Sequence, residues 1–100
     1  MQAGKGGLDM RELLLDGSKL QAWNDIHDWF AEQFGFPEHY GRNLDALYDC
    51  LGDYAAPPLR LRWLRFEESR VRLGEDAARA LLQLLQDVES ELDGFEVSVE

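Results

Sequence analysis

Two aspartates four residues apart form the pattern in this sequence that is best suited to chemistry. On a helix, Asp45 and Asp49 would share one face and repel each other by about 0.2–0.5 kcal/mol. His39 and Tyr40 come shortly before this pair, and Tyr48 stands directly before Asp49. Neighbouring carboxylates can bind a hard cation, act in acid–base catalysis, or pair with the cations of a partner. A solvated acidic face gives the same pattern.

The surrounding residues do not favour a metal or a catalytic centre. Asp53 adds a third carboxylate, but no loop supplies carbonyl oxygens at the short spacing that a cation site needs. No serine or cysteine nucleophile flanks His39, and Cys50 has no basic neighbour that would make it a thiolate. We interpret Cys50 as a packed thiol and His27 as a partly packed surface residue. We therefore expect no catalytic residue, metal or cofactor, and a hydrolase centred on the two aspartates and His39 remains an alternative.

Composition and charge exclude several classes of protein. Twenty acidic residues against ten basic ones give a formal charge of −10, and residues 24–53 carry seven acids against one base. A phosphate backbone would be repelled, so we expect no nucleic-acid partner and instead a basic protein that is attracted by long-range electrostatics. The 45% hydrophobic content is too high for a disordered acidic chain. No apolar run exceeds three residues, so we expect no membrane span.

Hydrophobic periodicity predicts one α/β domain over residues 11–100, preceded by a flexible N-terminal extension over residues 1–10. A single cysteine excludes disulfides within the chain, and we expect a cytoplasmic protein that is a monomer when free. Helices between successive strands favour parallel pairing. The predicted strands cover residues 12–16, 59–63 and 95–99, and the predicted helices cover residues 25–34, 44–51, 64–71 and 75–93.

Capping residues define the ends of the first two helices. Asn24 is a suitable N-cap for the first, which Gly35 ends. Asn43 caps the second helix, and Gly52 is predicted to end it. These bounds place Asp49 in the last turn, where the helix dipole favours a cation. Because folding alone does not explain an acid there, Asp49 is a candidate for function.

The sequence from residue 36 to residue 51 resembles a known motif. Its core reads Tyr40-Gly41-x-Asn43-Leu44-Asp45-Ala46-Leu47-x-Asp49-Cys50-Leu51. This string is similar to the central motif of the barstar family, whose members inhibit the ribonuclease barnase inside the cell. Weaker similarity extends over residues 12–99, in matching order. The resemblance implies a three-stranded parallel sheet with about four helices.

The resemblance also implies a function. In this family, acidic side chains on the motif helix enter the ribonuclease active site and take the place of the RNA phosphates. By position, Asp49 would be the central phosphate mimic and Asp45 the second charged contact. The remaining expected partner-binding residues are His39, Tyr40, Gly41 and Asn43 in the preceding loop, Tyr48 and Tyr54 on the helix, and Asp87 on the last helix.

Several residues depart from the family pattern. His39 replaces a tyrosine of the family, and Gly52 and Ala56 lack polar side chains that the family carries near the rim of the contact. Arg42 stands where the family carries an acid, so it would repel a basic nuclease or pair with an acid of a different target. As a whole, the resemblance favours an inhibitor and not an enzyme. Its partner would be a basic, guanyl-specific ribonuclease similar to barnase, or a related nuclease toxin. The alternative is an interaction or immunity module on the same fold whose partner is not a ribonuclease.

Overall fold

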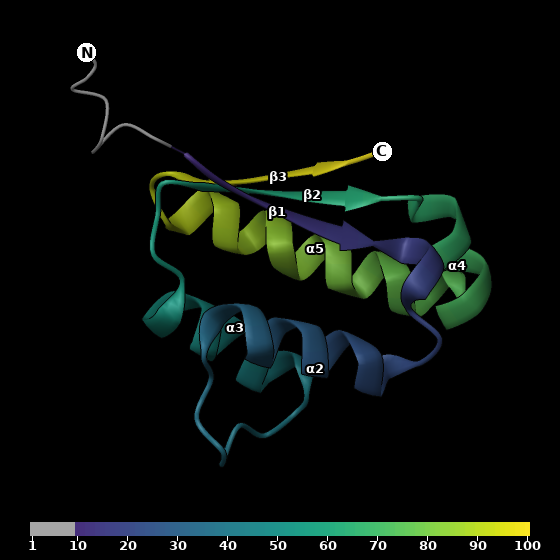
Figure 1. Ribbon diagram of the computed structural model, residues 1–100, viewed down its shortest axis with the longest axis horizontal. Helices are drawn as coiled ribbons and strands as arrows, with labels where there is room; N and C mark the ends of the chain where they lie inside the picture. Colours follow the sequence, from purple (N-terminus) through teal and green to yellow (C-terminus); the bar gives the residue numbers. More distant parts are fainter. Residues whose placement is uncertain (1–9) are drawn as a thin grey trace.

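Three parallel strands run side by side in the order β1, β2, β3 (Figure 1). They are β1 (Arg11–Asp16), β2 (Leu59–Leu64) and β3 (Phe95–Val99). In the register of the sheet, Leu13 lies opposite Leu61, which lies opposite Val97. The computed structural model describes residues 10–100, so residues 1–9 of the expected N-terminal extension lie outside the described residues. The expected three-stranded parallel sheet is confirmed.

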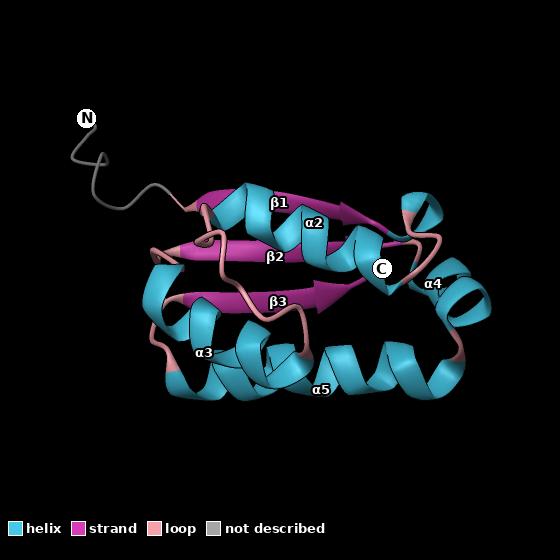
Figure 2. Cartoon of the chain, turned by 90° about the horizontal axis from the view of Figure 1, so that it is seen from below, coloured by secondary structure: helices cyan, strands magenta, loops and turns pink. Residues whose placement is uncertain are grey.

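Two helices follow each of the first two strands, as the hydrophobic pattern predicts. Between β1 and β2 lie η1 (Gly17–Lys19), a short 3₁₀ turn that was not expected, then α2 (Trp23–Phe34) and α3 (Leu44–Tyr54). Between β2 and β3 lie α4 (Phe66–Leu73) and α5 (Glu75–Glu91). Figures 1 and 2 show α2, α3 and α5 on one face of the sheet, with α4 beyond the carboxyl ends of the strands.

The alternation of β2 separates a buried face from an open one. Leu59, Leu61 and Trp63 are fully buried, whereas Arg60 and Arg62 project from the other face. Each helix on the buried side contributes an apolar stripe to the same core. The larger core side chains are Leu13, Leu15, Leu20, Ile26, Phe30, Phe34, Tyr40, Leu47, Leu51, Leu59, Leu61, Trp63, Leu81, Leu84, Leu85 and Phe95.

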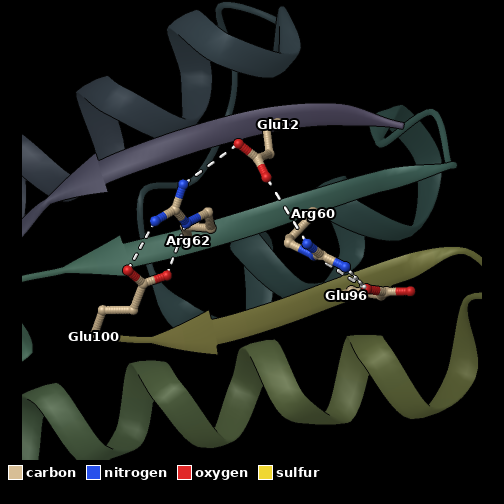
Figure 3. Close-up of polar contacts among 5 residues, drawn as sticks. All are labelled: Glu12, Arg60, Arg62, Glu96 and Glu100. Carbon is tan, nitrogen blue, oxygen red and sulfur yellow. Dashed lines mark hydrogen bonds and ion pairs between the residues drawn. The ribbon is translucent and has the colours of Figure 1, made fainter. Parts of the chain in front are cut away.

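The open face of the sheet carries a ladder of ion pairs (Figure 3). Arg60 lies 3.9 Å from Glu12 and 3.0 Å from Glu96, and Arg62 lies 3.5 Å from Glu12 and 2.7 Å from Glu100. Parallel sheets are usually covered on both faces by the helices that connect their strands, and such strands are apolar throughout. Here charged side chains of the three strands pair with one another, so this face can stay in water.

The first helix begins at Trp23, one residue before the position expected for its N-cap. Asn24 lies within α2, which starts at Trp23 with Ala22 at the N-cap position. The carboxylate of Asp25 accepts hydrogen bonds from the backbone N–H groups of Gln21 (2.7 Å) and Ala22 (3.3 Å). The prediction that Asn24 is the N-cap is therefore wrong, because Asp25 satisfies the free N–H groups from inside the first turn.

The carboxyl ends of β1 and β2 meet at α4. Leu64 pairs with Asp16 in the sheet, so α4 begins at Phe66 and not at residue 64 as expected. Gly17 packs against this junction, where a Cβ atom would collide with the carbonyl oxygen of Arg65 and the hydroxyl of Ser69. A glycine is therefore required for the close approach of η1 to α4.

Candidate functional site

The acidic face formed by Asp45 and Asp49 belongs to α3, which is held in place by two buried leucines and by a cap at its start. Leu47 and Leu51 are fully buried, and the side-chain oxygen of Asn43 accepts a hydrogen bond of 2.8 Å from the N–H of Ala46. The predicted cap at Asn43 is confirmed. Asp45 and Asp49 are exposed on the other side of the helix. Burial of the leucine stripe therefore orients both carboxylates toward solvent.

The helix is longer than its sequence predicts. Gly52 stays helical, and α3 continues to Tyr54, where Ala55 follows as the C-cap. The prediction that Gly52 ends the helix is wrong, since the ring of Tyr54 packs 5.9 Å from the ring of Phe36 and holds the additional turn. Asp49 therefore lies one turn before the last, and Asp53 occupies the last turn instead.

The aspartates of α3 form no ion pair with another described residue. Among residues 10–100, none of the ion pairs includes Asp45, Asp49 or Asp53. The arginines that form ion pairs among residues 10–100 do so with acids that lie outside α3. Within residues 10–100, the negative charge of α3 is thus not balanced by an ion pair, which favours association with a cation of a partner.

A shallow groove of about 370 Å³ lies where α3 contacts α5. Asp49, Gly52 and Asp53 line it from α3, and Glu91 lines it from α5. The hydroxyl of Tyr48 donates a hydrogen bond to Glu91, and this bond raises the pKa of Tyr48 above its ordinary value. The groove therefore has acidic walls that could receive a basic side chain.

Asp87 lies on α5 but does not line this groove. Its carboxylate is exposed and accepts a hydrogen bond of 3.0 Å from the amide of Gln83. Glu91, one turn further along α5, is the acid that faces Asp49 across the groove. Sequence reasoning missed Glu91, and the only signal for it was its four-residue spacing from Asp87.

Tyr40 joins the loop over residues 36–43 to the core. Only 8% of its surface is exposed, and its hydroxyl lies 2.6 Å from Nδ1 of His27, which is 5% exposed. Burial raises the pKa of Tyr40 to about 12, so the phenol remains a donor at neutral pH. Burial also lowers the pKa of His27, so the imidazole that shares this hydrogen bond is neutral at pH 7.

These contacts correct the interpretation of His27 as a partly packed surface residue. Its ring stacks on Trp23 at 5.9 Å and meets Tyr40 edge-on at 5.5 Å, so it belongs to the interior. With so little surface exposed, Tyr40 is placed to support the loop more than to offer contact area. His39, its neighbour, is exposed, as are Gly41 and Tyr54.

Neither a metal centre nor a nucleophile emerges from the described residues. Over residues 10–100, no group of three or more histidine, cysteine or acidic side chains is arranged to hold a metal ion. Burial raises the pKa of the Cys50 thiol, which keeps the sulfur protonated and poorly reactive. None of the helices in this part of the chain is long and apolar enough to cross a membrane.

An α/β domain that presents unpaired carboxylates on an exposed helix has the features of a protein-binding domain. Residues 10–100 match the family described as "Barstar (barnase inhibitor)". The chain belongs to the barstar family, and its fold agrees with the expected one. Members of this family are inhibitors and not enzymes, which confirms that expectation and removes the hydrolase alternative.

A Bacillus subtilis (strain 168) protein is similar over almost the whole chain. It is named "Putative ribonuclease inhibitor YrdF" and is 38% identical over 92 residues. The match covers 91% of this chain and 100% of the relative. Together with the family match, this similarity supports ribonuclease inhibition as the general activity and a ribonuclease as the partner.

Proposed function

We propose that the protein inhibits a guanyl-specific, barnase-like ribonuclease by placing carboxylates of α3 in the pocket that binds RNA phosphates. Asp49 would be the central mimic and Asp45 the second. The observation that supports this most is the exposed charge of α3, whose aspartates take part in none of the ion pairs among residues 10–100. A helical carboxylate has few rotamers to lose on binding, so it can be held ready for a cationic pocket.

The residues around these acids would complete the contact surface. Tyr48 and Tyr54 border the acidic face, and Asp87 would add charge from α5. The loop would contribute His39, Gly41 and Asn43, with Tyr40 supporting them from beneath. We propose further that the partner is basic or a nuclease toxin, and that the inhibitor acts in the cytoplasm as a monomer when free. An acidic surface would accelerate encounter with such a partner.

The test is inhibition of RNA cleavage by barnase and several other guanyl-specific ribonucleases, with wild-type inhibitor and Asp49→Ala. Removing one partner of a buried charge pair costs about 2–5 kcal/mol, which is roughly a 30- to 4000-fold rise in Kd. Glu32→Ala is the matched control, because it removes the same charge from an exposed position on α2. Glu32→Ala should change Kd only slightly.

Two results would contradict the proposal. The first is equal inhibition by wild type and Asp49→Ala. The second is failure of the wild-type protein to inhibit any ribonuclease of the panel, which would favour an interaction module with another partner. Association should also slow steeply as the salt concentration rises, since screening weakens the attraction between the two surfaces.

A further inference from the structure

The loop over residues 36–43 has few bonds of its own to define its shape. The N–H of Tyr40 donates to the carbonyl oxygen of Pro37 at 3.0 Å, and the side-chain amide of Asn43 donates to the carbonyl of Gly41 at 3.4 Å. Neither bond fixes the loop to the rest of the protein. Backbone hydrogen bonds attach the loop at its two ends, from the N–H of Phe36 to the carbonyl oxygen of Ala31 (3.0 Å) and from the N–H of Leu47 to the carbonyl oxygen of Asn43 (2.9 Å). Between these ends, attachment must come from side chains that reach other elements.

Arg42 reaches from this loop to α2. One guanidinium nitrogen, Nη2, lies 2.8 Å from a carboxylate oxygen of Asp28. The same nitrogen lies 3.2 Å from the carbonyl oxygen of Asn24 and 3.4 Å from its side-chain oxygen. Asn24 and Asp28 are four residues apart, so they are neighbours on one face of the helix. Three acceptors on α2 thus converge on one cation from the loop.

The backbone conformation of Arg42 also indicates that contacts hold this residue in place. Its φ of 53° lies in the left-handed region, which is uncommon for a residue other than glycine and is kept only where surrounding contacts hold it. Asp28 also neutralises the one cation in the acidic region of the chain. The charge of Arg42 is therefore paired with Asp28 on α2 in the free protein.

We propose that Arg42 is a positioning residue, which clamps the binding loop to α2 through Asp28 and Asn24. The buried contact between Tyr40 and His27 holds the inner side of the loop, and the Arg42 clamp holds its outer side. Between these two attachments, Gly41 and Asn43 keep one arrangement before the partner arrives. This inference rests on the proposed function, because the loop matters only if it contacts the ribonuclease. A loop that is already ordered loses less entropy on binding, which slows dissociation.

A clamp can be distinguished from a direct contact and from a simple charge effect. If Arg42 acted only by charge, Arg42→Asn would take the formal charge from −10 to −11 and speed association, and Asp28→Asn would take it to −9 and slow it. If Arg42 touched the partner, its loss would weaken binding equally with or without Asp28. A clamp predicts that both single changes act in the same direction, that Arg42→Asn has the larger effect because it also removes the contacts with Asn24, and that adding Asp28→Asn to Arg42→Asn has no further effect.

The experiment is a double-mutant cycle with Arg42→Asn, Asp28→Asn and the double variant. Asparagine is chosen at position 42 because it tolerates the left-handed backbone. Amide hydrogen exchange over residues 39–43 is measured in the free protein, and dissociation rates are measured with whichever ribonuclease of the panel the wild type inhibits. Arg79→Asn is the charge-matched control, since Arg79 is an exposed partner of Glu75 on α5.

Each single variant should raise both the exchange rates and the dissociation rate by about two- to fivefold, as loss of an exposed ion pair allows. The double variant should match Arg42→Asn, and the swapped pair, Arg42→Asp with Asp28→Arg, should restore both rates toward wild type. Unchanged exchange over residues 39–43, or additive effects on dissociation, would overturn the clamp. If the wild type inhibits no ribonuclease, the proposed function fails, and the exchange measurement by itself still decides whether the clamp exists.

Discussion

Replacing Tyr40 with phenylalanine tests how the binding loop is fixed to the core. The change deletes one hydroxyl, while the ring can keep its contacts with Phe36 and His27 at 4.8 and 5.5 Å between centroids. The deleted group is the partner of Nδ1 of His27, which has 5% of its surface exposed. In the wild type, no buried side-chain nitrogen or oxygen of residues 10–100 lacks a hydrogen-bond partner. The variant would introduce one at His27.

The expected cost follows from that burial. Leaving a buried polar group without its partner costs about 1–3 kcal/mol, which is a large part of the stability of a domain of this size. About 2 kcal/mol corresponds to a fall of roughly 8–16 °C in Tm for a domain near 100 residues. Both Tyr40 and His27 are buried, so water cannot easily replace the lost hydroxyl.

Urea unfolding at pH 7 measures this difference, with the dependence on denaturant expected to stay unchanged. Tyr54→Phe is the matched control, because Tyr54 is 44% exposed and its ring packing would be retained. The control should change the free energy of unfolding by less than about 0.5 kcal/mol. If Tyr40→Phe costs no more than Tyr54→Phe, the bond between Tyr40 and His27 does not stabilise the fold, and its role in holding the loop is refuted.

Two further predictions concern pH and the sheet. Burial lowers the pKa of His27 below 6.5, so its contribution to stability is complete above that pH and is lost as the pH falls through the lower pKa of the folded state. His27→Asn should therefore flatten the decline in unfolding free energy between pH 7 and pH 5. An unchanged slope would contradict this. On the open face of the sheet, the hydrogen bond from Arg62 lowers the pKa of Glu100, which shows that the pair favours the charged carboxylate. Glu100→Gln should therefore lower Tm slightly at neutral pH, and by less in 0.5 M salt. An effect on Tm that is independent of salt would argue against the ion pair.

Local patterns in the sequence determined the order and type of the elements. The strict alternation from Leu59 to Trp63 specified a strand with one buried face, and the side chain of Asn43 specified the start of α3. The four-residue spacing of Asp45 and Asp49 placed both on one helical face. These features depend on neighbours within a few residues, where backbone geometry and hydrophobic periodicity act directly.

The tertiary structure decided which side chains meet across the chain. His27 reads as a surface residue until Tyr40, thirteen residues away, is folded against it. Arg42 reads as an isolated cation in an acidic region until Asp28, fourteen residues away, pairs with it on α2. Glu91 joins the acidic groove through Tyr48, forty-three residues away. Such pairs leave no periodic signal, because burial and charge pairing depend on how separate elements pack. The sequence by itself therefore identified the acidic helix, and only the packing showed how its loop is held in place.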